Sequence, residues 1–193
     1  MVKEKRVKTQ ALAVGAILTA LVVVLQLMGS FVRFGPFSIS LVLIPIVIGA
    51  AMSDWKIGGW LGLVFSVAVI LSGDAMAFFA IDVAGTIITV LAKGILCGIS
   101  AGVVYKLFEK RNSYLAVALA AVVCPIVNTG VFLLGCRLFF FETIAQWGAA
   151  QGFVNAAEYM FLGLVGGNFL VELGANIILA PVIYRIINAV KKG

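Results

Sequence analysis

The sequence carries very little charge. Only 11% of its 193 residues are Asp, Glu, Lys or Arg, whereas 63% are hydrophobic. A soluble domain is about one-quarter charged and about half apolar. This chain therefore lacks the polar residues needed to cover a water-facing surface. That shortage excludes an ordinary soluble enzyme, a nucleic-acid-binding domain and a disordered protein.

Histidine is absent altogether, and its absence removes several kinds of site. Zinc held by imidazole, haem held by an axial histidine and a Ser-His nucleophile all need that side chain. The three cysteines, Cys97, Cys124 and Cys136, lie in apolar runs without CxxC spacing. They predict neither a disulfide framework nor a thiolate metal cluster. We expect no metal, no cofactor and no catalytic residue.

Motifs for ATP hydrolysis and acyl transfer are missing too. The sequence has no GxxxxGK[ST] loop and no GxSxG turn, so it predicts neither a P-loop ATPase site nor a hydrolase nucleophile. An intramembrane enzyme would have to exchange protons between Glu172 and Lys93. No nucleophile or metal set accompanies these two residues, and we expect the protein not to be an enzyme.

Long apolar runs predict an all-α integral membrane protein. Barrel strands alternate apolar and polar residues, whereas these runs are unbroken, and a spanning helix needs about 20 apolar residues. The prediction is a single six-helix membrane domain over residues 1–193. Its spans are expected at residues 10–31, 37–52, 57–71, 83–107, 114–140 and 159–187.

The positions of the basic residues predict the orientation of these spans. Eleven of the 14 lysines and arginines fall on one side of the six-span arrangement, and cytoplasmic segments are the ones enriched in such residues. Both termini are therefore expected in the cytoplasm of a prokaryotic cell, with the protein in the plasma membrane and in contact with lipid. The net charge of +6 is then a topology signal, and no nucleic-acid partner is expected. The eleven are Lys3, Lys5, Arg6, Lys8, Lys56, Lys106, Lys110, Arg111, Arg185, Lys191 and Lys192.

The connecting segments on the other side are longer and rich in glycine and aromatic residues. They cover residues 28–37, 72–82 and 141–158. Such loops often bind ligands, and aromatic residues also gather at membrane interfaces. Both interpretations stay open.

Several polar residues lie where a membrane disfavours them. Lys93 is about ten residues into the fourth span, and Thr89 precedes it by one helical turn. Asn168, Glu172 and Asn176 recur every four residues in the sixth span, so they share a face. Such groups must point into the bundle. Together they predict a polar substrate site in the outer half of the bundle.

The candidate residues have a functional and a structural interpretation. In the functional interpretation, Lys93, alone or together with Arg137, would receive a carboxylate, and the amides would bind hydroxyl or amide groups. Alternatively, Lys93 and Glu172 form a structural ion pair, and the asparagines join helices. Asp74 is either a ligand contact or part of a solvated turn. The candidate substrate-binding residues are Lys93, Asn128, Arg137, Asn168, Glu172, Asn176, Asp74 and Thr89.

Three motifs, in this order, carry a family resemblance. They are Ala16-Ile-Leu-Thr-Ala20; Phe34-Gly-Pro-Phe-Ser-Ile-Ser-Leu running into Ile44-Pro-Ile-Val-Ile-Gly-Ala; and Gly58-Gly-Trp-Leu-Gly-Leu-Val-Phe followed by Ser72-Gly-Asp. With its size and six expected spans, the chain resembles the substrate-binding S components of energy-coupling factor (ECF) transporters over nearly its whole length.

The resemblance implies a mechanism. An S component binds a vitamin at its outer side, docks on a shared transmembrane coupling subunit with two ATPase subunits, topples in the membrane and releases the vitamin inside. It would thus serve an ABC-type importer without an ATPase site of its own. Close-packing small residues of the first helix are the expected docking surface, namely Ala11, Gly15, Ala16 and Ala20.

The buried cation and the amides suit a vitamin with a carboxylate and hydroxyl groups. Pantothenate fits best, and the chain looks most like S components for that vitamin. Riboflavin and folate stay open because the aromatic outer loops offer stacking surfaces. A stand-alone channel or facilitator is the alternative of another class, but it needs a polar path across the membrane, and the polar residues gather in one half.

Overall fold

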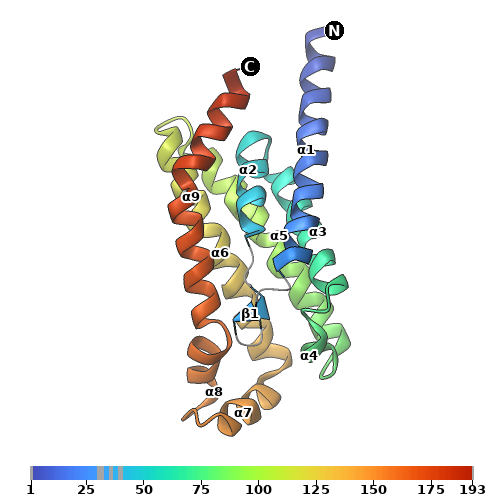
Figure 1. Cartoon of the computed structure of the whole chain (residues 1–193), viewed down its shortest axis with the longest axis vertical. Helices are drawn as coiled ribbons and strands as arrows, with labels where there is room; N and C mark the ends of the chain where they lie inside the picture. Colours follow the sequence, from blue (N-terminus) through green and yellow to red (C-terminus); the bar gives the residue numbers. More distant parts are fainter. Residues whose placement is uncertain (1, 30–32, 35–36, 39–40, 193) are drawn as a thin grey trace.

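The computed structural model describes residues 2–29, 33–34, 37–38 and 41–192. The described chain is a bundle of long helices that run roughly along one axis (Figure 1). Residues 2 and 192 lie at the same end of the bundle, which we call the terminal end. The opposite end, the α7 end, carries the short helices α4, α7 and α8 (Figure 1).

Helices make up almost all of the described chain, which confirms the all-α prediction. The long helices α5, α6 and α9 are each long and apolar enough to cross a membrane, and shorter apolar helices lie at Ala13–Gly29, Leu43–Met52 and Trp55–Leu71. The main helices are α1 (Val2–Gly29), α2 (Leu43–Met52), α3 (Trp55–Leu71), α5 (Val83–Phe108), α6 (Ser113–Phe139) and α9 (Gly166–Lys192). The shorter ones are α4 (Met76–Phe79), α7 (Phe141–Ala150), α8 (Ala156–Glu158) and the π-helical η1 (Tyr159–Leu164).

Two helix boundaries differ from the expected spans. The second span was expected from residue 37, but β2 (Phe37–Ser38) pairs antiparallel with β1 (Arg33–Phe34), and α2 begins only at Leu43. Aromatic side chains favour strands, and Pro36 disfavours helix in the residue before it. The sixth span was expected to be one helix from residue 159. Instead, η1 ends at Leu164 and α9 begins at Gly166.

The expected outer loop of residues 141–158 is partly helical. Helix α7 begins directly after α6, and the hydrogen bond from Ile144 N to Phe140 O, at 3.0 Å, continues the helical pattern across the junction. Helix α5 begins as expected, because Asp82 Oδ1 accepts a hydrogen bond from Gly85 N at 3.0 Å. Such an aspartate cap satisfies a backbone donor that the helix leaves free.

Glycines bring α3 and α5 into backbone contact. A Cβ atom at Gly62 would overlap the carbonyl of Gly94, and one at Gly58 would overlap the carbonyl of Gly98. Ser66 Oγ also donates to Val90 O, at 2.7 Å, across the same interface. The contact fixes α3 against α5 beside the cavity described below.

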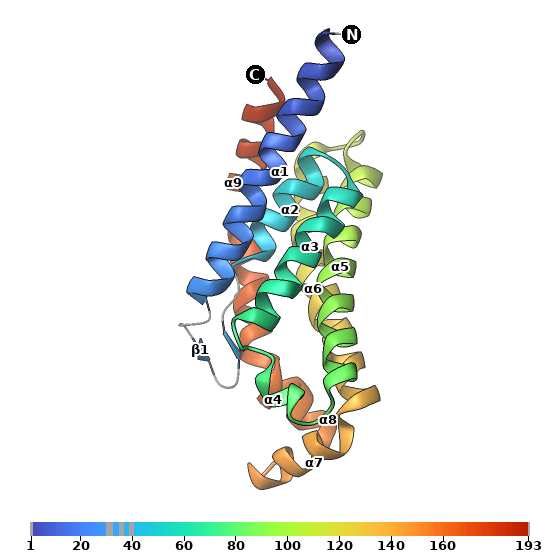
Figure 2. The same ribbon diagram turned by 90° about the vertical axis from the view of Figure 1, so that its right-hand side faces the viewer.

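Helix α1 lies at the edge of the bundle, next to α2 and α3 (Figure 2). Its inner face buries Leu18, Val22 and Gln26. Trp60 Nε1 in α3 donates to Thr19 Oγ1 at 3.2 Å. The opposite face of α1 stays uncovered, and Ile17 is 67% exposed there.

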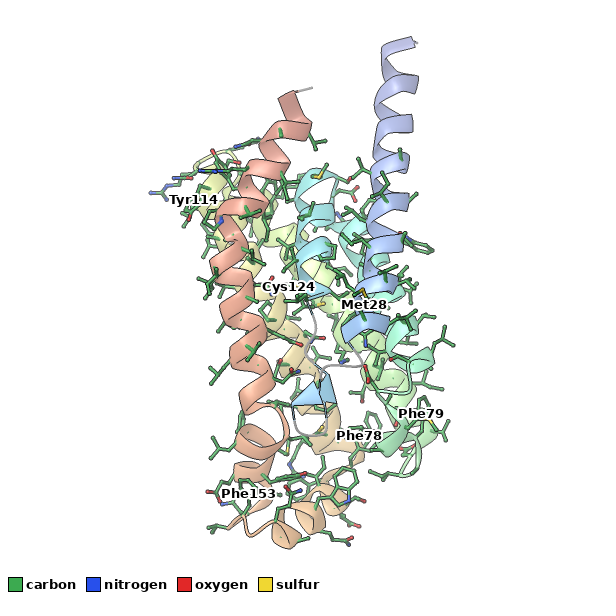
Figure 3. All side chains as sticks on the ribbon, in the orientation of Figure 1. Met28, Phe78, Phe79, Tyr114, Cys124 and Phe153 are labelled. Atoms are coloured by element: carbon green, nitrogen blue, oxygen red, sulfur yellow. The ribbon has the colours of Figure 1, made fainter. Side chains whose placement is uncertain are left out.

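The buried side chains form two clusters. The larger one joins α1, α2, α3, α5, α6 and α9, and the smaller one lies toward the α7 end and includes four aromatic residues, namely Phe78, Phe132, Phe140 and Tyr159. Figure 3 shows Phe78 and Phe153 at that end, Tyr114 near the terminal end and Cys124 between them.

Candidate functional site

A cavity lies among the helices in the half of the bundle toward the α7 end. It encloses about 760 Å³ of space between atoms, part of it open to solvent. Helices α1, α3, α4, α5, α6 and α9 all contribute to its wall. Its polar lining residues are Gln26, Asp74, Thr86, Thr89, Lys93, Asn128, Thr129, Asn168 and Glu172, and its aromatic ones are Phe65, Phe78, Phe132, Phe140 and Phe169.

Six of the eight candidate substrate-binding residues line this cavity. They come from four separate stretches of the chain: Asp74 precedes α4, Thr89 and Lys93 lie in α5, Asn128 lies in α6, and Asn168 and Glu172 lie in α9. The one-turn spacing within α5 and within α9 places each pair on one helical face. The structure therefore brings together residues that the sequence separates by up to about one hundred positions.

Arg137 and Asn176 lie elsewhere. Arg137 is exposed near the end of α6, and its guanidinium carbon lies 4.1 Å from the ring centroid of Phe141. Asn176 is fully buried in α9, and its Nδ2 donates to the backbone oxygen of Glu172 at 2.9 Å. Neither residue lines the cavity. Helical spacing alone does not say whether a residue near a helix end faces inward.

Lys93 lies between two aromatic rings. Its Nζ is 5.4 Å from the ring centroid of Phe65 in α3 and 5.5 Å from that of Phe132 in α6. A cation within about 6 Å of an aromatic centroid is attracted by the ring quadrupole. Across the described residues, the ammonium group forms no ion pair with a carboxylate, so the alternative of a direct Lys93–Glu172 pair is not realised.

Glu172 is a buried carboxylate in the same wall, with 4% of its surface exposed. Asn168 Nδ2 donates to its Oε1 at 3.3 Å from the preceding turn of α9. A buried carboxylate is costly unless hydrogen bonds or opposite charges compensate it. The cavity wall thus carries the buried carboxylate of Glu172, the partly buried carboxylate of Asp74 and the ammonium group of Lys93.

Within the described part of the chain, three polar atoms at the cavity have no hydrogen-bond partner. They are Thr89 Oγ1, Asn128 Oδ1 and Asn168 Oδ1, and all are buried. Leaving such an atom unsatisfied costs about 1–3 kcal/mol. A small molecule that presents hydroxyl or amide donors to these oxygens would recover that cost.

Sequence reasoning missed Gln26, although the wall includes it. Gln26 is 2% exposed, and its Nε2 donates to Asp74 Oδ2 at 2.7 Å. Gln26 directly follows an apolar run over residues 20–25, and this was the available signal, since such a group must find a partner inside the bundle. Phe65 and Phe132 were missed as well, because an apolar ring in an apolar run carries no distinguishing signal.

A second cavity lies beyond the first, at the α7 end. Its wall includes Trp147 and Gln151 of the α7 region and Tyr159 of η1. Asp74 and Phe78 line both cavities. The Phe78 ring packs against Phe132, Phe140 and Trp147, with centroid separations of 5.5, 5.0 and 5.9 Å. Phe78 therefore stands between the two spaces.

The predicted docking residues lie along α1. Ala16 and Ala20 are exposed, and Gly15 is half-buried with open space around it. Ala11 is in the helix, but its side chain lies outside what the structure describes. Among the described residues, no group of three or more Cys, Asp or Glu side chains is placed to hold a metal ion.

The described chain is thus an apolar helical bundle, with helices long enough to cross a membrane and a cavity lined by a lysine and other polar side chains. The family model for the substrate-specific component of ECF transporters matches residues 10–184. The chain belongs to that family, which confirms the resemblance predicted from its motifs. It is therefore a transmembrane transport protein of vitamin uptake.

One relative is the pantothenic acid transporter PanT of Lactococcus lactis subsp. cremoris (strain MG1363). It is 30% identical to this chain over 196 residues, which cover 93% of this chain and 94% of the relative. No solved structure matches the chain.

Proposed function

We propose that this protein is the high-affinity pantothenate-binding subunit of an ECF-type importer. The observation that carries the proposal is the Lys93 ammonium group, which lies at the cavity between the rings of Phe65 and Phe132. A membrane helix accepts a lysine at a cost of a few kcal/mol. An anionic ligand that binds there offsets that cost.

Pantothenate matches the polar groups of the cavity. Its carboxylate pairs with Lys93, and its hydroxyl and amide N–H groups donate to the unsatisfied oxygens of Asn128 and Asn168. Thr89 lies one turn from Lys93 and accepts or donates at the same wall. A relative whose name states pantothenic acid transport supports this choice of vitamin.

The proposed topology has six spans with both termini in the cytoplasm. Residues 2 and 192 lie at one end of the bundle (Figure 1), as an even number of spans requires. Helix α2, with ten residues, rises about 15 Å, which is half of the hydrocarbon thickness. The cavity then lies toward the outside, and Arg137 is at the outer interface.

The exposed face of α1 is the proposed contact with the coupling subunit. Ala16 and Ala20 are four residues apart and exposed, and small residues at this spacing allow close helix approach. The coupling subunit with its two ATPases would dock there, topple the loaded protein and open the cavity toward the cytoplasm. ATP hydrolysis is assigned to those subunits.

Binding to the purified protein tests this proposal. Isothermal titration calorimetry in lipid nanodiscs, with pantothenate, riboflavin and folate in parallel, should give one-to-one binding of pantothenate alone. Mass spectrometry of small molecules released from the purified protein checks the same point without a chosen ligand. If the protein bound only riboflavin or only folate, that vitamin would replace pantothenate as the proposed substrate.

Uptake assays distinguish this proposal from the alternative of a stand-alone facilitator. Proteoliposomes that contain only this protein should take up no labelled pantothenate beyond the amount bound. Uptake appears when the coupling subunit, both ATPases and ATP are present. Steady uptake by the protein alone would contradict the proposed dependence on a coupling module.

A further inference from the structure

The side chain of Lys93 is held from two neighbouring helices. Phe65 of α3 and Phe132 of α6 flank α5, and their ring centroids lie 5.4 and 5.5 Å from Nζ. Both rings are buried, with 2% and 8% of their surface exposed. A lysine has a flexible four-carbon stem, and the two rings restrict where its ammonium group can lie before any ligand binds.

The rings themselves are fixed by their surroundings. Phe132 meets Phe78 edge to face, with an interplanar angle of 88°. Phe65 lies on α3 less than one turn after Gly62, and Gly62 lies against the backbone of Gly94 in α5. Because Lys93 adjoins Gly94 in sequence, the helix contact that sets the position of Phe65 also sets the position of Lys93.

The chemistry of this arrangement differs from that of an ion pair. An aromatic face attracts a cation without supplying a negative charge. A carboxylate partner would neutralise the ammonium group and compete with any anionic ligand. The rings therefore hold the cation in a fixed place while its charge stays available to the cavity.

We propose that Phe65 and Phe132 are positioning residues that hold the Lys93 ammonium group so that the cavity selects an anionic ligand over its neutral analogue. This inference rests on the proposed function and adds the residues that set its charge selectivity. Preorganised groups improve affinity because less freedom is lost on binding. The benefit is expected for the ligand's carboxylate and not for the rest of the molecule.

The test compares pantothenate with pantothenol, in which an alcohol replaces the carboxylate. Calorimetry in nanodiscs gives the ratio of the two affinities for the wild type and for Phe65→Leu and Phe132→Leu. Each substitution should lower pantothenate affinity by about threefold to thirtyfold, with little change for pantothenol. Phe132→Tyr keeps the aromatic face and should restore the ratio.

Phe140→Leu is the matched control. Phe140 also lines the cavity, but its ring packs against Phe78 and Phe139. The rings next to the Lys93 ammonium group are those of Phe65 and Phe132. This variant should change both affinities in parallel and leave their ratio at the wild-type value. Thermal unfolding of every variant separates a lost contact from a lost fold.

Two results would overturn the inference. If Phe65→Leu and Phe132→Leu lowered both affinities equally, or neither, the rings would only pack and would not position the cation. In that case pantothenate binding by the wild type would leave the proposed function intact. A wild type that bound neither compound would overturn the proposed function, and the inference with it.

Discussion

Gln26 Nε2 donates a hydrogen bond to Asp74 Oδ2 at a distance of 2.7 Å. This bond joins the last turns of α1 to the segment between α3 and α4. Both residues line the cavity. The helix that carries the proposed docking face is thereby connected directly to the wall of the proposed vitamin site.

Replacing Gln26 with methionine should speed release of the vitamin. The substitution keeps the length of the side chain but removes the donor, so the segment around Asp74 loses one of its attachments. The dissociation rate of labelled pantothenate should rise by about tenfold to one-hundredfold, which corresponds to the loss of a hydrogen bond to a charged group worth about 1.5–3 kcal/mol. A filter-binding chase experiment measures that rate.

Thr19→Val is the control for this variant. Thr19 also joins α1 to α3, through the bond from Trp60 Nε1 at 3.2 Å, but it does not line the cavity. Its dissociation rate should match the wild type. Equal acceleration by both variants would show that α1 is loosened in general and that the Asp74 contact has no special part.

Replacing Lys93 with methionine should nearly abolish pantothenate binding. Methionine retains most of the apolar stem but cannot pair with a carboxylate. The loss of a charge-assisted contact in a buried site predicts a fall in affinity of at least about tenfold to one-hundredfold. Calorimetry measures it, with Lys56→Met as an exposed control at the terminal end. Unchanged affinity would make Lys93 a structural residue.

Asn128→Leu should have opposite effects on stability and on binding. Asn128 Oδ1 is buried and unpaired, so its removal should stabilise the empty protein by about 1–2 kcal/mol. The same change removes a ligand contact and should weaken pantothenate binding by about tenfold. Thermal unfolding without ligand and calorimetry with ligand provide the two values.

Asn176→Leu separates these two effects. Asn176 Oδ1 is likewise buried and unpaired, but the residue lies outside the cavity lining. Its substitution should change thermal stability and leave pantothenate affinity unchanged. A matching loss of affinity in this variant would extend the site along α9.

Gly62→Ala should destabilise the protein. The added methyl group would overlap the carbonyl of Gly94, and overpacking of this kind costs about 1–3 kcal/mol. Gly130→Ala, in α6, is the control because no atom lies within 4 Å of its added Cβ. The control should unfold at the wild-type temperature or above it, since alanine favours helix. Equal melting temperatures for Gly62→Ala and wild type would contradict the close contact.

Ala16→Trp and Ala20→Trp should block transport but spare vitamin binding. Both residues are exposed on α1, so a bulky side chain leaves the fold intact and prevents close approach of another helix. Uptake by proteoliposomes with the complete importer is compared with calorimetric affinity. Ala84→Trp, at an exposed position of α5, should leave both unchanged. An equal loss of binding in the α1 variants would make these alanines residues of the fold.

Much of the cavity was predictable because lipid excludes polar side chains. Lys93 and Glu172 had to face inward, and four-residue spacing placed Asn168 beside Glu172. That rule predicts that a polar side chain points into the bundle only for residues in the middle of a long helix. It fails for Arg137, which lies near a helix end and stacks on Phe141 in an exposed position.

The parts of the cavity and fold that the sequence does not predict depend on contacts between segments that are apart in the chain. Phe65 and Phe132 are indistinguishable from other apolar residues until α3 and α6 are placed on either side of α5. The start of α2 at Leu43 reflects a local strand pairing of Phe34 with Phe37, which an apolar run does not reveal. The small-residue contacts of α3 with α5 were predictable as close packing, but their partners were not.

The backbone contact between α3 and α5 also limits how this protein can change shape. Because the backbone of Gly62 meets that of Gly94 and the backbone of Gly58 meets that of Gly98, a rotamer change cannot clear these two contacts and let one helix slide past the other. The two helices must move as a single rigid body, which carries Phe65 and Lys93 together. Opening the cavity then requires α1 or α9 to swing relative to this pair, so labels for detecting the motion belong on those outer helices.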